Sequence, residues 1–184
     1  LVLSSRVSQV LIERQSAVSS KGAAANRPSL FEAITQPKQK FLAVPSVSSE
    51  RREYVPLSYL DSNQIMNNSI FAIENASLST FGILMSRAFM VWVRTVSSRL
   101  KSDYQIASTV VYNTFAFPNN LDEHEEKIET FASEVLSARD AYPSETLACL
   151  YDPISMPLAL RRAHEKLDKA VLSAYGLKAS ASDE

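Results

Sequence analysis

The residues in this sequence best suited to chemistry are the charged and amide side chains of one short segment, Arg99–Gln105. If the segment is extended, alternate residues share a face, so Lys101, Asp103 and Gln105 point the same way. A lysine can donate to O6 and N7 of guanine, an aspartate can accept from N4 of cytosine, and a glutamine can bracket adenine. Spacing alone, however, favours a solvated turn with an internal Lys101–Asp103 ion pair, because exposed pairs are common.

A second polar segment, Ser48–Glu53, lies between two runs of strand-forming residues. Its arginines, Arg51 and Arg52, are placed to contact phosphate groups. The same residues also fit a charged hairpin in which the neighbouring glutamates compensate the arginines. The sequence leaves both interpretations open.

Patterns expected of a catalytic or cofactor site are weak in this sequence. The glycines stand far apart, at Gly22, Gly82 and Gly176, so they form no phosphate-binding loop. Cys149, His124 and His164 are too few for a structural zinc site, which needs four ligands. We expect His164, which follows two arginines on a predicted surface helix, to be a solvated side chain.

The triplet Glu125-Glu126-Lys127 has the Glu-x-Lys pattern that follows a catalytic aspartate in many nucleases. It falls in the acidic beginning of a predicted amphipathic helix, where carboxylates stabilise the helix dipole without any catalytic role. We therefore predict that this part of the protein is not itself catalytic.

Composition places the chain among ordinary globular proteins. Its 184 residues are 46% hydrophobic and 21% charged, enough for one substantial core or for one domain with a small addition. A single cysteine excludes an internal disulfide and favours a reducing, cytoplasmic location. The most apolar window, Leu78–Val96, contains Arg87 and Arg94, so we expect a buried helix and no membrane contact.

Charge divides the chain into two regions. Residues 1–118 contain twelve Lys and Arg against seven Asp and Glu, whereas residues 119–184 contain seven against thirteen. The first region therefore carries +5 and the second −6, so only the first is suited to face a polyanion. The chain also begins without a methionine, and we read it as part of a longer protein.

The periodicity predicts an α+β (mixed α/β) region followed by a small all-α region. The first region has an amphipathic helix near 3–14, a loop over 16–37, strands near 41–47, 54–59, 69–73 and 108–117, and a central helix over 77–97. Predicted helices at 122–139, at 144–150 and from Pro157 to Gly176 form the second. We place the boundary between domains 1–120 and 121–184.

Several segments, in the same order along the chain, resemble the C-terminal part of MmeI-like (type IIL) restriction–modification enzymes. They are Val47–Pro56, Ser98–Tyr104, Val111–Phe115, Tyr151–Pro153 with Met156–Pro157, and Ala174–Gly176. The resemblance implies a target recognition domain followed by a helical C-terminal domain. It also implies a parent enzyme with an upstream N6-adenine methyltransferase domain, which would use S-adenosylmethionine, and Mg²⁺ if the parent cuts DNA. No cofactor is expected in this part.

The resemblance also implies site residues. Side chains matching Arg99–Gln105 read bases of double-stranded DNA in the major groove, which points to Lys101, Ser102, Asp103 and Gln105. Family members often have glycine in place of Ser98 and arginine in place of Gln105, and the second departure changes which base is preferred. We expect Lys101 and Asp103 to read one G·C pair.

Contacts to the DNA backbone follow from charge and loop placement. The candidates are Arg51, Arg52, Lys38, Lys40 and Arg99. The alternative function is a protein-interaction module whose acidic helices pack on a partner domain.

Overall fold

The computed structural model describes residues 2–16, 27–30 and 36–178. The chain divides into two compact units, residues 1–36 and 37–184. The first contains α1 (Val2–Ser16), which confirms the helix predicted near 3–14. Most of the loop predicted over 16–37 lies outside the described residues. Within it, Arg27–Leu30 form a turn closed by a hydrogen bond from the Leu30 amide to the Arg27 carbonyl, 3.1 Å long.

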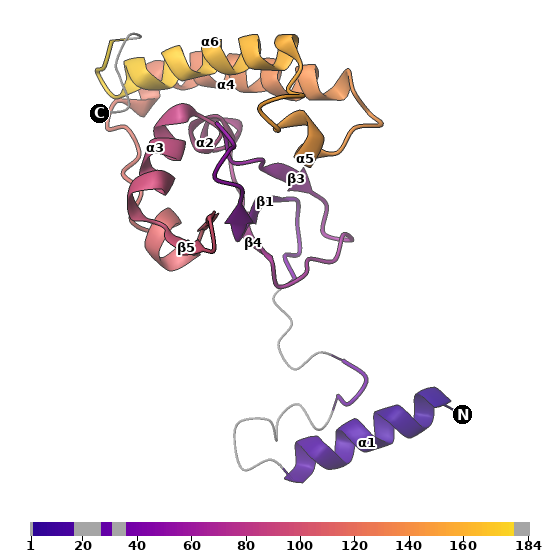
Figure 1. Cartoon of the computed structure of the whole chain (residues 1–184). Helices are drawn as coiled ribbons and strands as arrows, with labels where there is room; N and C mark the ends of the chain where they lie inside the picture. Colours follow the sequence, from indigo (N-terminus) through magenta and orange to yellow (C-terminus); the bar gives the residue numbers. More distant parts are fainter. Residues whose placement is uncertain (1, 17–26, 31–35, 179–184) are drawn as a thin grey trace. The chain divides into compact units, whose positions relative to one another are not determined.

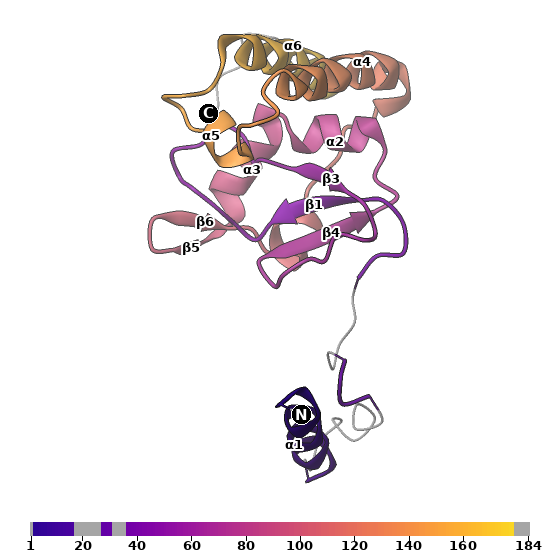
Figure 2. The same cartoon turned by 90° about the vertical axis from the view of Figure 1, so that its right-hand side faces the viewer.

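The second unit holds two small antiparallel sheets (Figures 1 and 2). One has the order β3-β1-β4, from Ser58–Leu60, Phe41–Pro45 and Ile70–Glu74. The other has the order β2-β6-β5, from Val47–Ser48, Asp103–Gln105 and Ser98–Leu100. The strand predicted over 54–59 is wrong at its beginning, because only residues 58–60 pair with β1.

The central helix predicted over 77–97 is two helices, α2 (Leu78–Leu84) and α3 (Arg87–Val96). Ser77 caps α2 as predicted, accepting a hydrogen bond of 3.1 Å from the Thr80 amide. A second cap, Ser86, accepts from the Phe89 amide and begins α3. Apolar residues continue at helical spacing across the break between α2 and α3. In the sequence, only the N-cap residue Ser86 indicates where the second helix begins.

The strand predicted over 108–117 is wrong. Ser108–Tyr112 form the π-helix η2, closed by a bond of 2.9 Å from the Asn113 amide to the Ser108 carbonyl. The Trp92 indole donates to the Val111 carbonyl at 3.0 Å, while Val111 itself is buried. Val111 is thus packed on α3, and this tertiary contact overrides the β-propensity of the run.

Helices α4 (Leu121–Asp140) and α6 (Leu158–Ala174) run side by side over α2, with the short α5 (Leu147–Leu150) between them in sequence (Figures 1 and 2). One core joins them to the sheet region, with Leu42, Phe81, Val135 and Leu167 fully buried in it. The α+β fold with a helical C-terminal region is therefore confirmed. The boundary predicted at residue 120 stays a prediction.

Candidate functional site

The segment Arg99–Gln105 forms a tight β-hairpin. Strands β5 and β6 pair antiparallel, with Ser98 opposite Gln105, Arg99 opposite Tyr104 and Leu100 opposite Asp103. Lys101 and Ser102 make the two-residue turn between them, and Lys101 has φ = 58°, in the left-handed region. Figure 2 shows the hairpin extending from one side of the unit, away from the layer formed by α4 and α6.

Each face of this hairpin has a distinct chemistry, because residues paired across antiparallel strands point to the same side. Ser98, Leu100, Asp103 and Gln105 share one face, which we call the outer face. Arg99 and Tyr104 share the other face, where Tyr104 is only 6% exposed.

The predicted alternation holds for two of the three residues. Asp103 and Gln105 share the outer face, as expected for alternate residues of a strand. Lys101 does not continue that strand, because the chain reverses direction at the turn. Lys101 and Ser102 are exposed at the tip. Within the described residues, no ion pair joins Lys101 to Asp103.

The hairpin is joined to the rest of the second unit through its second strand, β6. Val47 of β2 pairs with Gln105, Ser48 pairs with Tyr104, and the Ile106 amide donates to the Ser46 carbonyl at 2.8 Å. Tyr104 and Ile106 belong to the core. The turn is therefore the exposed end of a hairpin whose second strand is held by the buried Tyr104 and is followed by the buried Ile106.

Contacts of Ser98 and Arg99 organise the side chains of the hairpin. The Ser98 hydroxyl donates to the Gln105 side-chain oxygen at 2.9 Å. On the opposite face the Arg99 guanidinium lies 3.9 Å from the centre of the Tyr104 ring and donates to the Ser102 carbonyl at 2.7 Å. Its Nη1 atom is also 3.6 Å from a carboxylate oxygen of Glu50.

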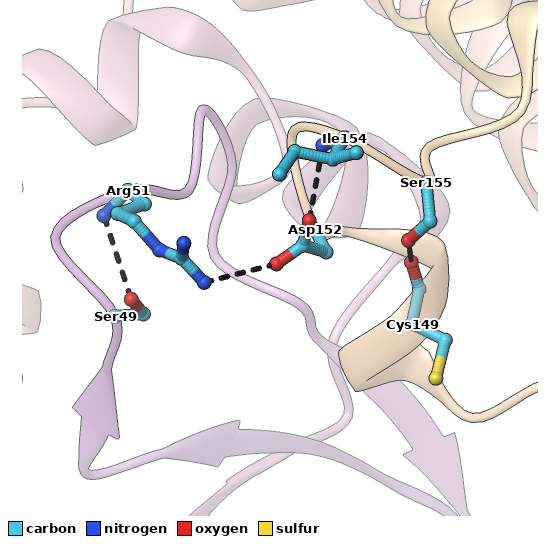
Figure 3. A network of polar contacts seen from close by, with 6 residues as sticks. All are labelled: Ser49, Arg51, Cys149, Asp152, Ile154 and Ser155. Carbon is cyan, nitrogen blue, oxygen red and sulfur yellow. Dashed lines mark hydrogen bonds and ion pairs between the residues drawn. The ribbon is translucent and has the colours of Figure 1, made fainter.

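The other basic candidates lie outside the hairpin. Arg51 is exposed, and its guanidinium forms an ion pair of 3.3 Å with Asp152, in the turn that follows α5 (Figure 3). Arg52 is half-buried, while Lys38 and Lys40 are exposed just before β1. Lys40 places its ammonium 5.0 Å from the centre of the Tyr59 ring. Of the five candidates, the structure brings only Arg99 into the hairpin.

The segment Ser48–Glu53 connects the hairpin to the C-terminal helices. Glu50 faces Arg99, Arg51 pairs with Asp152, and Glu53 accepts two hydrogen bonds from Arg161, 2.9 and 3.0 Å long. Its glutamates therefore compensate arginines elsewhere in the chain, which neither sequence interpretation included.

The prediction that His164 is solvated is wrong. His164 is fully buried, stacked on the Tyr54 ring at 4.0 Å between ring centres. The Tyr151 hydroxyl oxygen accepts two hydrogen bonds from Arg139 and lies 2.8 Å from the His164 Nε2 atom. Since that oxygen accepts from Arg139, its proton points to Nε2, which must then be unprotonated.

The pKa values in this cluster follow from burial. Burial, and secondarily the charge of Arg139, lower the pKa of His164 to about 3. Burial raises the pKa of Tyr151 to about 12 despite the opposing effect of Arg139. The pKa of Tyr54 is also raised, by burial and then by Asp168, whose carboxylate accepts a hydrogen bond of 2.8 Å from the Tyr54 hydroxyl. His164 is thus neutral near neutral pH, and Tyr151 and Tyr54 keep their hydroxyl protons.

A signal for this cluster is present in the sequence. His164 follows Leu160 by four residues and precedes Leu167 by three, so it belongs to the apolar stripe of α6. The two arginines before His164 suggested an exposed position, whereas its helical spacing to Leu160 and Leu167 indicates the buried position that the structure shows.

The Glu-x-Lys triplet has a structural role. Glu125 accepts a hydrogen bond of 2.8 Å from the Ser79 hydroxyl, and Glu129 accepts one of 3.3 Å from the Ser79 amide. The carboxylates of α4 thus bind the beginning of α2. Across the described residues, no group of three His, Cys, Asp or Glu side chains is arranged to hold a metal ion. None of the helices described here has the length and apolar character needed to cross a membrane.

The fold and the hairpin define the class of this protein. It is an α+β domain that presents polar side chains from an anchored hairpin and shares its core with a helical C-terminal region. Two family models match the chain, "MmeI, target recognition domain" over residues 2–119 and "MmeI, C-terminal domain" over residues 112–184. The chain therefore belongs to the MmeI family and comprises these two parts.

Relatives agree with this assignment. The DNA methyltransferase A of Bacillus subtilis (strain 168) is 43% identical over 143 residues, which cover 78% of this chain and 16% of that protein. The structure of the type IIL restriction–modification enzyme MmeI in complex with DNA matches all of this chain with a TM-score of 0.89 and 37% identity, over 25% of its own length. The chain thus spans a quarter or less of these relatives.

Proposed function

We propose that this chain is the sequence-reading part of a bacterial restriction–modification enzyme. It holds double-stranded DNA by backbone contacts and reads base edges in the major groove, so that an upstream domain of the same polypeptide can methylate an adenine at N6. Support comes from the membership of the family and from the similarity to an enzyme whose structure contains DNA. We assign S-adenosylmethionine, and Mg²⁺ if the parent cleaves DNA, to the upstream domains. A cytoplasmic location belongs to the same proposal.

The single observation that carries base reading is the tip of the β5–β6 hairpin. Lys101 and Ser102 form the turn, Asp103 and Gln105 follow on the outer face, and the strand that bears them is anchored in the core. A two-stranded ribbon of this kind fits the major groove of B-DNA. Its side chains provide a cationic donor, a hydroxyl, an anionic acceptor and an amide.

Lys101 and Asp103 are assigned to one G·C pair. Lysine donates to O6 and N7 of the guanine, and aspartate accepts from N4 of the paired cytosine. The turn separates the two side chains, which suits them to the two bases of one pair. Such contacts discriminate between bases by roughly 1–3 kcal/mol each.

Arg51, Arg52, Lys38 and Lys40 are proposed phosphate contacts. Arg51 and the two lysines are exposed and Arg52 is partly so, as phosphate contacts require. Binding through such residues releases counterions, so the affinity should fall steeply as salt increases.

An exchange of charge at the hairpin tests the function. The full-length enzyme carrying Lys101→Glu with Asp103→Arg should methylate sites in which this G·C pair is inverted and lose activity at the original site. The matched control exchanges two exposed charges of α4, Glu123→Arg with Lys127→Glu, and should keep the original site. Methylation mapped by sequencing of treated DNA gives the readout. Retention of the original site by the hairpin variant refutes the assignment.

Measuring DNA affinity at two salt concentrations tests the alternative role as a protein-interaction module. Absence of binding at low salt, with the upstream domains present, would favour an interaction module and contradict DNA reading.

A further inference from the structure

Arg99 was a candidate phosphate contact, yet its surroundings in the hairpin indicate a different role. It lies on the face opposite Asp103 and Gln105, because it pairs with the buried Tyr104. Its guanidinium covers the Tyr104 ring at 3.9 Å, a cation–π distance. The Arg99 side chain therefore packs on the buried Tyr104, although 45% of it remains exposed.

The guanidinium also holds the turn itself. Nη1 donates a hydrogen bond of 2.7 Å to the Ser102 carbonyl, the last carbonyl of the turn. The preceding residue, Lys101, has φ = 58°, a conformation that L-residues other than asparagine and aspartate rarely adopt. Arg99 thus supplies a contact that keeps this strained turn in one geometry, and that geometry sets where the side chains of Lys101 and Asp103 begin.

Glu50 completes the arrangement. Its carboxylate lies 3.6 Å from the same Nη1 atom and comes from the segment Ser48–Glu53. That segment is bound to the C-terminal region through the pairs Arg51–Asp152 and Glu53–Arg161. The Arg99–Glu50 pair is therefore connected to the C-terminal region through these two ion pairs.

We propose that Arg99 is a positioning residue for base reading, with Glu50 as its partner, and that it is not a phosphate contact. Through its contacts with Tyr104 and Ser102 it holds the turn so that Lys101 and Asp103 reach the two bases of one pair. This inference rests on the proposed function of the hairpin. It predicts that Arg99 controls discrimination between sequences and not the general affinity for DNA.

The experiment compares the full-length enzyme with its Arg99→Lys variant on two duplexes. One carries the site mapped for the wild-type enzyme by methylation sequencing, and the other carries that site with the G·C pair inverted. Dissociation constants are measured at several salt concentrations. Lysine keeps the positive charge but lacks the planar fork that reaches Tyr104, Ser102 and Glu50 together.

A positioning role predicts that Arg99→Lys lowers the ratio of the two affinities about tenfold or more. The slope of the logarithm of affinity against the logarithm of salt concentration should stay unchanged. A phosphate contact predicts the opposite pattern, with the ratio preserved in Arg99→Lys. In that case Arg99→Ala would weaken both duplexes equally and reduce the slope by about one. That pattern overturns the inference.

Glu50→Gln provides a second test that leaves Arg99 in place. Loss of its charge should also reduce the affinity ratio, by a smaller factor than Arg99→Lys. If Glu50→Gln instead strengthens binding to both duplexes equally, the arginine acts on phosphate and the inference is wrong. Arg162→Lys, an exposed arginine of α6, is the matched control and should change neither quantity.

Lys101→Ala separates the inference from the proposed function. If Lys101→Ala leaves the affinity ratio intact, the hairpin does not read this pair and the proposed function fails. If Lys101→Ala abolishes the ratio while Arg99→Lys and Glu50→Gln preserve it, base reading stands and only the positioning role fails.

Discussion

The hydroxyl of Ser98 donates a hydrogen bond of 2.9 Å to the side-chain oxygen of Gln105, its neighbour across the β5–β6 hairpin. This bond orients the amide of Gln105. The oxygen turns back toward Ser98 and uses one of its two lone pairs there, so the NH₂ group is the freer end. A glutamine held in this way is suited to donate to an acceptor such as N7 of a purine.

Loss of this bond should change the specificity at one base. In the full-length enzyme, Ser98→Ala should lower the preference for the base that Gln105 faces by roughly 2- to 10-fold, since one hydrogen bond contributes about 0.5–1.5 kcal/mol. Methylation rates on duplexes varied at each position provide the measurement. The position read by Lys101 is the internal control and should be unaffected. An unchanged preference at every position would show that Ser98 does not orient Gln105.

Burial of neutral His164 predicts acid sensitivity. Its folded-state pKa of about 3 lies below the ordinary value of 6.5, so the unfolded chain binds an extra proton between these values. Stability is therefore full above pH 6.5 and decreases as the pH falls toward 3, by up to about 1.4 kcal/mol per pH unit. Urea unfolding should give a free energy about 2 kcal/mol lower at pH 5 than at pH 7 from this group.

The His164→Gln variant should lose this part of the pH dependence, whatever its stability at pH 7. His124→Gln removes the other histidine, from a partly exposed position on α4, and should keep the wild-type profile. Equal pH profiles for wild type and His164→Gln would contradict the assignment of a buried neutral imidazole.

Gly82 allows α2 to approach α4 and α6 closely. A Cβ atom there would lie 2.8 Å from Cγ2 of Ile128 and 3.2 Å from both Ala132 Cβ and Leu167 Cδ1. Gly82→Ala gains about 1 kcal/mol of helix propensity. Overpacking costs about 1–3 kcal/mol, and the stiff β-branched Ile128 side chain places this site at the upper end. We expect a net destabilisation of about 1 kcal/mol or more in denaturant unfolding.

A double-mutant cycle identifies the clash. In an Ile128→Ala background the Cγ2 atom is absent, so Gly82→Ala should become neutral or stabilising. If Gly82→Ala costs the same in both backgrounds, contact with Ile128 is not the cause.

The Arg51–Asp152 pair predicts a gain in DNA binding when Asp152 is neutralised. The Asp152 carboxylate accepts a hydrogen bond of 3.0 Å from the Ile154 amide (Figure 3), and Asp152→Asn keeps an oxygen for this bond. Arg51 is then released toward phosphate, and the salt slope should steepen by about 0.9. Stability should change by less than about 1 kcal/mol, since the pair is exposed.

Adding Arg51→Gln to Asp152→Asn should remove this gain in DNA binding. A gain that persists in the double variant would mean that Asp152 acts by its own charge and that Arg51 is not a phosphate contact.

The elements that the sequence predicted well are those with local signals. The Ser77 cap, the helices near 3–14 and 122–139 and the strand near 69–73 follow from capping and periodicity, which act over a few residues. The segment 108–117 was predicted wrongly, because its β-branched residues also fit a π-helix packed on Trp92. Local propensity does not distinguish these environments.

In the candidate site, too, some features follow from the local sequence and others from contacts with distant residues. The residue types of Lys101, Ser102, Asp103 and Gln105, and the resemblance to a family, were sufficient to select the segment from the sequence. Its shape depended on partners elsewhere in the chain. The turn at Lys101 separates this residue from the strand of Asp103 and Gln105, and β2, from an earlier part of the chain, anchors that strand.

The sequence by itself determined the α+β class and the helical C-terminal region, and it selected the segment proposed to read bases, because these depend on residue type and short-range spacing. Only the tertiary structure decided that Arg99 faces Tyr104 and Glu50, and that His164 is buried between Tyr54 and Tyr151. The contacts of Glu50 and Tyr54 span roughly 50 to 110 positions along the chain. A side chain's role at that range depends on which distant groups desolvate it and complete its hydrogen bonds.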